Sequence, residues 1–247
     1  MIFGQTTNQP KLSVFVNQVG KGYFRMMRGS QEVFKVPAGW YQDDDNQMLR
    51  VQNGIIGEPS FLADYYFFNN GTYEVEMREG SLVCIHYPDF TYQDEVGNYV
   101  EPMLGYLGRH TLQEYNNAIV DEYIGQALDG VGPLNVIARM TPEHPSLFAG
   151  LLVVGSLRGN FSYNEYWYGE NIKNEAPSTE VFALPAACNN PTVKRFYDHF
   201  NKFGEKVEKE EKGNNLCSSK EPIDITNISV ALYRTICCSL NKHLEMR

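Results

Sequence analysis

The stretch from His144 to Tyr168 constrains the fold more than any other part of the chain. Its first half, Leu147 to Leu157, is an apolar run without a charged residue. Because a membrane-spanning helix needs about 20 apolar residues, this run is too short to cross a bilayer. Its length is typical of a strand that is buried on both faces.

The second half of the stretch has a different pattern. Arg158-Gly159-Asn160 favours a turn, because Gly and Asn tolerate positive φ angles. From Phe161 to Tyr168 the residues alternate between two faces with period two, which is typical of a strand. We therefore predict a hairpin with one buried and one aromatic strand at the centre of a β core, and nothing in it has the pattern of a catalytic loop.

The length and charge of the chain exclude several classes of protein. With 247 residues it fits a single domain over residues 1–247, which buries roughly 70–75% of its unfolded surface. The net charge of −9 and pI near 5.1 argue against nucleic-acid and membrane-surface partners. The N-terminus lacks a secretory signal pattern, and no window has transmembrane length. We expect a soluble protein that stays in the compartment where it is made.

The cysteines favour a cytosolic protein, and the glycosylation sequons are interpreted in that light. The five cysteines are an odd number without metal-ligand spacing, and we predict reduced, mostly buried thiols. They are Cys84, Cys188, Cys217, Cys237 and Cys238. Without a signal peptide the three Asn-x-Ser/Thr sequons, at Asn70, Asn160 and Asn227, are expected to occur by chance.

The N-terminal part predicts a meander of three strands. These strands cover Leu12–Val16, Tyr23–Arg28 and Glu32–Val36, with turns at residues 20–22 and 29–30. Pro37 and Gly39 favour a loop that continues into the acidic run 43–46. This run lacks the Gly at position six and the closing Glu of a calcium-binding EF-hand loop, so we interpret it as a solvated loop.

A second hairpin and a further strand follow. Phe61–Phe68 and Thr72–Arg78 have strand composition, and Asn69-Asn70-Gly71 between them is a strong hairpin signal. Residues 81–87 continue as another strand, which Pro88 ends.

Two helices are predicted beside these strands. Thr111 to Glu114 forms a capping box, and apolar residues at helical spacing continue from it to a stop at Gly130. After a strand over 134–140 and the central hairpin, Asn190-Pro191 begins a second helix that ends near Gly213. Periodicity leaves the tail, 223–240, open between strand and helix. The whole pattern predicts a mainly β (α+β) fold, a β-sandwich core with flanking helices.

Clustered chemistry is not visible in the sequence. The five histidines do not show the i, i+4 spacing of a metalloprotease motif, and Ser156 is not central in a nucleophile elbow. Cys188 with Asp198 and His199 is the nearest to a thiol site, but nothing near Cys188 lowers a thiol pKa. We predict no catalytic residue, no metal site and no required cofactor, and hence a non-enzyme with a structural or binding role.

Short segments in a fixed order carry a resemblance to a known family. They are His144-Pro145, Gly150, Arg158 and Tyr166–Tyr168 at the central hairpin, Ser13–Val16, Phe34–Val36, Tyr65-Tyr66, Asn70-Gly71, Arg195-Phe196 after Cys188, and Ile223–Ile225, Asn227 and Val230–Leu232 near the end. In this order they resemble the polyhedrins of cypoviruses, which are insect viruses. The segment 89–132 resembles them poorly, and the helical arm that precedes the first strand in that family has no counterpart here.

The resemblance implies a structural matrix protein. Such a protein forms homotrimers that pack into crystalline viral occlusion bodies in the cytoplasm of the infected cell. These crystals embed virus particles, dissolve at alkaline pH and can trap nucleotides, for which no residue is assigned here. Ionisation of the 16 Tyr, together with Lys and Cys, is compatible with alkaline release. The alternative function is a soluble β-sandwich module that binds carbohydrate or protein through exposed aromatic residues such as Trp167.

Overall fold

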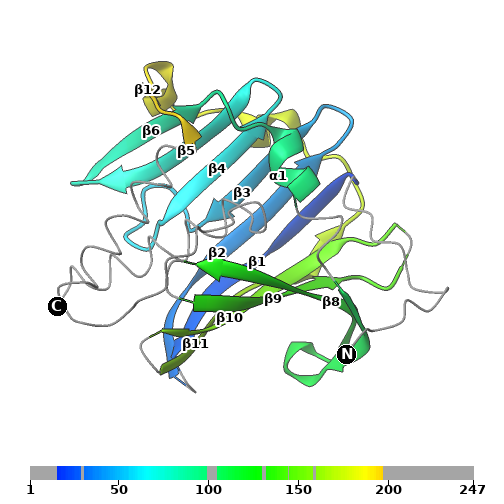
Figure 1. Ribbon diagram of the computed structural model, residues 1–247. Helices are drawn as coiled ribbons and strands as arrows, with labels where there is room; N and C mark the ends of the chain where they lie inside the picture. Colours follow the sequence, from blue (N-terminus) through cyan, green and yellow to red (C-terminus); the bar gives the residue numbers. More distant parts are fainter. Residues whose placement is uncertain are drawn as a thin grey trace.

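The computed structural model describes residues 16–28, 31–98, 105–129, 132–143, 145–157 and 160–196. These residues are mostly in β-strands, which confirms the mainly β class that the sequence predicts. In the described ranges, twelve strands form one continuous sheet. The sheet is strongly curved, and the short helix α1 (Tyr92–Asn98) lies on the side toward which it curves (Figure 1).

The strands are β1 Gln18–Arg28, β2 Gln31–Asp43, β3 Met48–Asn53, β4 Ala63–Phe68, β5 Gly71–Arg78, β6 Ser81–Tyr87, β7 Gly105–Leu112, β8 Ala118–Asp129, β9 Gly132–Met140, β10 Phe148–Leu157, β11 Asn160–Lys173 and β12 Thr192–Val193. Three 3-10 helices are η1 Gln113–Tyr115, η2 Thr179–Phe182 and η3 Ala186–Asn189. Across the sheet the order is β12-β6-β5-β4-β3-β2-β1-β11-β10-β9-β8-β7.

Two antiparallel meanders lie side by side in this sheet. The first contains β1 to β6 and the second β7 to β11, and pairing between β1 and β11 joins them. The short β12 adds to β6 in parallel at the outer edge. The centre of the sheet is therefore built from strands that are far apart in the sequence.

The pairing of β1 with β11 contains an irregularity that bends the sheet. Tyr23 lies opposite Trp167 in the register of the two strands. The next registered pair is Lys21 and Asn171, so three residues of β11 face Gly22 alone. Extra residues in one strand bend it and increase its twist. Only glycine fits at position 22, because a Cβ there would lie 1.7 Å from the carbonyl oxygen of Trp167.

The main hydrophobic core covers the inner face, which we define as the side toward which the sheet curves. Buried side chains from both meanders belong to it, among them Leu49, Phe67 and Met140. Tyr92 and Val96 of α1 pack into the same core. The two halves of the curved sheet thus share one apolar interior, and α1 covers part of it.

The outer face carries two smaller clusters. The first contains Cys84 and Cys188 and is covered by the segment 174–191, which includes η2 and η3. A disulfide joins these two cysteines, and Arg50 holds the same segment through a hydrogen bond to the carbonyl oxygen of Val181 at 2.9 Å. The second cluster lies under η1 and contains Leu112, Tyr115, Val120, Ala149 and Trp167.

Predictions based on period two and on turn residues are confirmed for several strands. β4 and β5 form the hairpin predicted around Asn69-Asn70-Gly71, and β10 pairs with β11 in antiparallel fashion as predicted. β6 and β9 also lie where strands were expected. The burial of β10 differs from the prediction, because Val153 is buried on the inner face while Val154 on the opposite face is only half-buried.

The helix predicted from Thr111 to Gly130 is wrong. This region ends β7, forms η1 and then builds β8. Asn116 and Asn117 both adopt left-handed backbone angles, with φ of 52° and 60°, which reverses the chain direction. In β8, Ile119 is 52% exposed while the next residue, Val120, is buried, and this alternation is the period of a strand.

Two predicted interruptions in the first meander are also wrong. Residues 20–22 lie within β1, where the register irregularity requires Gly22. Pro37 and Gly39 lie within β2. Gly39 leaves space for the ring of Tyr41, because a Cβ on residue 39 would lie 2.5 Å from that ring.

The cysteine prediction is wrong for two of the five residues. Cys84 and Cys188 form a disulfide because the segment 174–191 folds back over the outer face and brings their Cα atoms to 5.1 Å. The other three cysteines lie outside the described residues. The second helix does not begin at Asn190, since β12 follows it, and the remainder of that helix, the tail and most of the strand predicted over 12–16 also lie outside.

Candidate ligand cavity

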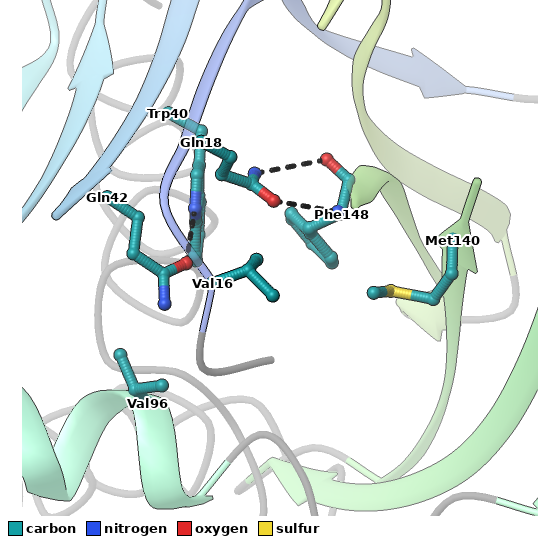
Figure 2. Close-up of a pocket in the computed structure, with 7 residues that line it drawn as sticks. All are labelled: Val16, Gln18, Trp40, Gln42, Val96, Met140 and Phe148. Carbon is teal, nitrogen blue, oxygen red and sulfur yellow. Dashed lines mark hydrogen bonds between the residues drawn. The ribbon is translucent and has the colours of Figure 1, made fainter. Parts of the chain in front are cut away.

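A cavity lies at the end of the sheet where β1, β2, β9 and β10 meet helix α1 (Figure 2). The space enclosed between these side chains is only about 10 Å³, which is room for about one water molecule. Apart from Val16, which is half-buried, the residues that line it are buried. The lining consists of Val16, Gln18, Trp40, Gln42, Val96, Met140 and Phe148.

Gln18 connects two strands that are not neighbours in the sheet. The register of β10 with β11 begins at Gly150, so the backbone of Phe148 has no registered partner in β11. The Phe148 N–H donates to Oε1 of Gln18 at 2.9 Å, and Nε2 of Gln18 donates to the Phe148 carbonyl oxygen at 3.5 Å (Figure 2). The side chain of Gln18 thereby supplies hydrogen-bond partners for the buried N–H and carbonyl groups of Phe148, at a position where β10 is not in register with β11.

A second set of hydrogen bonds attaches α1 to the cavity wall. Trp40 Nε1 donates to Oε1 of Gln42 at 3.1 Å, and Gln42 Nε2 donates to the Tyr92 hydroxyl oxygen at 3.1 Å. The Tyr92 hydroxyl in turn donates to Oδ1 of Asp44 at 2.8 Å. Burial, and then the hydrogen bond to Asp44, raise the pKa of Tyr92 above its ordinary value, so this hydroxyl stays a donor over a wide pH range.

The chemistry of the wall favours an apolar occupant. The rings of Trp40 and Phe148 pack against each other with centroids 4.7 Å apart. The amides of Gln18 and Gln42 are engaged by the protein, and no lining residue is titratable. Cavities with such walls bind apolar groups, but drug-sized ligands need roughly 300–1,000 Å³. The enclosed space is far smaller, so an apolar group enters only when lining side chains such as Val16 move outward.

A buried ion network lies on the outer face and is separate from the cavity. Nη1 of Arg139 donates to Glu165 at 2.6 Å, and Arg25 binds the other oxygen of the same carboxylate. Arg139 also pairs with Glu122 at 3.0 Å, and Arg25 donates to the Tyr115 hydroxyl at 2.9 Å. Burial, and then the charge of Glu165, raise the pKa of Tyr115. Because every charge has an opposite partner, we interpret this network as a set of ion pairs that joins β1, β8, β9 and β11.

Those polar residues singled out in the sequence that the structure describes do not assemble into a site. Cys188 is bonded to Cys84 and is not a free thiol. Ser156 lies in β10, while Asp198 and His199 are outside the described residues. His86 stacks on the ring of its cross-strand neighbour, at 4.3 Å between centroids.

The acidic run 43–46 forms hydrogen bonds within the protein. Asp43 accepts from the backbone and side chain of Asn46, and Asp45 accepts from Asn17. Within the described ranges, no group of three or more His, Cys, Asp or Glu side chains could hold a metal ion. The prediction of no catalytic residue stays a prediction.

No helix in the described part of the chain is long and apolar enough to cross a membrane.

The cavity residues were missed in the sequence because they come from five separate segments. Trp40 and Gln42 lie in the region interpreted as a loop, and Gln18 was taken to precede a turn. Trp40 and Gln42 lie on the opposite face from Tyr41, and this alternation was a sequence signal for a strand. Pro37 and Gly39, just before it, favoured a loop instead.

Comparison with known proteins gives likenesses to solved structures alone. No protein-family model and no curated protein matches the chain. Among solved structures, the crystal structure of an uncharacterized conserved protein from Thermus thermophilus is similar with a TM-score of 0.44 and 9% sequence identity. The match covers 73% of this chain and 91% of that one.

Proposed function

We propose that this chain is a binding protein that accepts a small apolar group in the cavity between α1 and the curved sheet. The observation that carries the proposal is the composition of the cavity wall, whose polar groups, the amides of Gln18 and Gln42 and Nε1 of Trp40, all form hydrogen bonds within the protein. A sugar would require convergent donors and acceptors that are not already used. The binding module considered from the sequence used exposed aromatic residues such as Trp167 for carbohydrate or protein, but Trp167 is only 1% exposed, so the binding proposed here has a different place and an apolar ligand.

The size of the cavity limits the ligand. The enclosed space of about 10 Å³ holds no aromatic ring as it stands, so a ring or a short aliphatic chain binds only when lining side chains such as Val16 and Val96 move outward. A longer chain would have to extend past α1 and Val16 at the mouth. The ligand is held by dispersion and by removal of its apolar surface from water, at about 25 cal/mol per Å².

The two tryptophans of the chain allow a direct test. Trp40 lines the cavity, whereas Trp167 lies in the outer-face cluster under η1. In a Trp167→Phe protein, titration with benzene or straight-chain alcohols should change the emission of Trp40. The Trp40→Phe protein keeps only Trp167 and should show no change with the same compounds. A panel that leaves Trp40 emission and the melting temperature unchanged would contradict the proposal.

The occlusion-body matrix remains a second candidate, supported by one feature of the sheet. Among the described strands β7 has a neighbour on one side only, and Leu107 on it is 47% exposed. An exposed edge strand with an apolar side chain is a template for pairing with another copy of the chain. Cells that express the chain would then contain crystals visible by light microscopy, and Leu107→Lys would prevent them. Soluble chain without particles would reject this function.

A further inference from the structure

We propose that Asn70 is the acceptor of an N-linked oligosaccharide and that this chain folds in an oxidising, secretory compartment. Asn70-Gly71-Thr72 is one of the three sequons in the sequence. Two independent observations of the structure favour its use: the place of Asn70 in the fold and the disulfide between Cys84 and Cys188. The inference is independent of the ligand proposed for the cavity.

Asn70 lies at the tip of the β4–β5 hairpin. Phe68 pairs with Gly71, so Asn69 and Asn70 are the two residues between the strands, and both are exposed. Gly71 has a φ of 128°, and a Cβ there would lie 2.7 Å from the carbonyl oxygen of Tyr87. Glycine at this position turns the chain tightly and leaves the neighbouring Asn70 in solvent, where an attached oligosaccharide displaces no protein contact.

The third residue of the sequon, Thr72, contacts the interior of the protein. Thr72 is buried, and its hydroxyl donates to the carbonyl oxygen of Phe90 at 2.7 Å. This hydroxyl is available to a transferase only before the hairpin packs, so the modification has to occur on the nascent chain. That order is the one followed when a chain is glycosylated as it enters a secretory compartment.

The disulfide supports the same compartment. Disulfides that hold a fold together persist in oxidising compartments and are rare in the cytosol. The Cys84–Cys188 bond joins residues 104 positions apart and fixes the segment 174–191 on the outer face. It therefore contributes to the structure itself, as expected for a protein that folds where such bonds are stable.

The chemical step requires a co-substrate, which is an oligosaccharide linked to a polyprenyl diphosphate. The side-chain amide nitrogen of Asn70 forms a bond to the anomeric carbon of the first sugar. The bond from that carbon to the diphosphate oxygen breaks, the polyprenyl diphosphate leaves, and the amide loses one proton to a base of the transferase. No electron transfer takes place in this step.

The test uses the full chain, preceded by a cleavable secretion signal and expressed in insect cells. Peptide mapping of the secreted protein should find an oligosaccharide on Asn70, and digestion with a peptide N-glycosidase should convert this residue to Asp. Asn70→Gln should remove the modification, whereas Asn69→Gln on the same turn should keep it. Thr72→Ser should also keep it, because serine retains the hydroxyl.

Three outcomes would overturn the proposal. The first is secreted chain with an unmodified Asn70, and the second is modification at Asn160 or Asn227 alone. The third is a chain that is not secreted and contains free thiols at Cys84 and Cys188. Because Asn70 is exposed, Asn70→Gln should fold like the parent chain, and its melting temperature after enzymatic removal of glycans from both proteins verifies this.

Discussion

The ring of Trp40 in β2 lies 4.7 Å from the ring of Phe148 in β10, although two strands, β1 and β11, separate β2 from β10 in the sheet. In a flat sheet three strand spacings would hold their backbones about 14 Å apart. The contact between the rings of Trp40 and Phe148 therefore shows that the sheet is strongly curved at this end. The same curvature brings the walls of the cavity together, so loss of this contact should also disturb the proposed ligand site.

Truncation of this contact should be costly. Phe148→Ala removes a buried ring from both the core and the cavity wall, and we expect the free energy of unfolding to fall by about 3–5 kcal/mol. Leu107→Ala, at a position that is 47% exposed, is the control and should change it by less than about 0.5 kcal/mol. Denaturant unfolding followed by circular dichroism measures both. Equal effects of the two variants would show that Phe148 is not part of the core.

The bend between β1 and β11 should depend on Gly22. In Gly22→Ala the new methyl group would meet the Trp167 carbonyl oxygen at 1.7 Å, so the two strands must separate. We expect a lower melting temperature and loss of ligand binding, since the cavity lies at the end of the same strands. In Gly105→Ala the nearest atom is 3.8 Å away, and this variant should melt like the parent chain. A Gly22→Ala protein as stable as Gly105→Ala would refute the described register.

Removal of the disulfide should destabilise the chain without touching the cavity. In a double variant, Cys84→Ala with Cys188→Ala, the free energy of unfolding should fall by about 2–5 kcal/mol, because the unfolded chain gains freedom. Reduction of the parent protein should give a similar loss. Two reactive thiols in the untreated, folded protein would contradict the bond.

Stability should decrease at alkaline pH. Burial, and then the charge of Asp121, raise the pKa of Tyr123 to about 12, whereas an unfolded chain has a tyrosine pKa near 10. The folded state therefore keeps a proton that the unfolded state releases between these values. Its contribution is complete below about pH 10 and is lost as pH rises toward 12. Unfolding midpoints measured from pH 8 to 12 should fall less steeply for Tyr123→Phe, and identical slopes would exclude this residue.

Local patterns in the sequence predict the hairpins well. Asn69-Asn70-Gly71 and the alternation after Asn160 determine turn and strand from neighbouring residues alone, and β4, β5, β10 and β11 follow them. The helix predicted from Thr111 failed because Tyr115 and Tyr123 have helical spacing by coincidence. Tyr115 lies in η1 and stacks on the ring of Trp167. Tyr123 lies in β8 and packs into the core on the inner face.

The cavity could not be predicted from local patterns. It depends on the side chain of Gln18 reaching Phe148, 130 residues further along the chain, and on a register irregularity opposite Gly22. Neither feature produces a periodic pattern in the sequence, because each depends on strands that come together only in the folded sheet. The Cys84–Cys188 pair is likewise a product of the tertiary fold.

The most direct test of the binding proposal is the dissociation constant of the best apolar compound for two matched tryptophan variants. Val96→Trp places a large ring in the cavity from α1, whereas Val193→Trp places it on β12, where the native side chain is 64% exposed. Isothermal titration should show binding at least about tenfold weaker for Val96→Trp, a loss of about 1.4 kcal/mol, and unchanged binding for Val193→Trp. Equal affinity of the two variants would place the ligand elsewhere and contradict the proposed function.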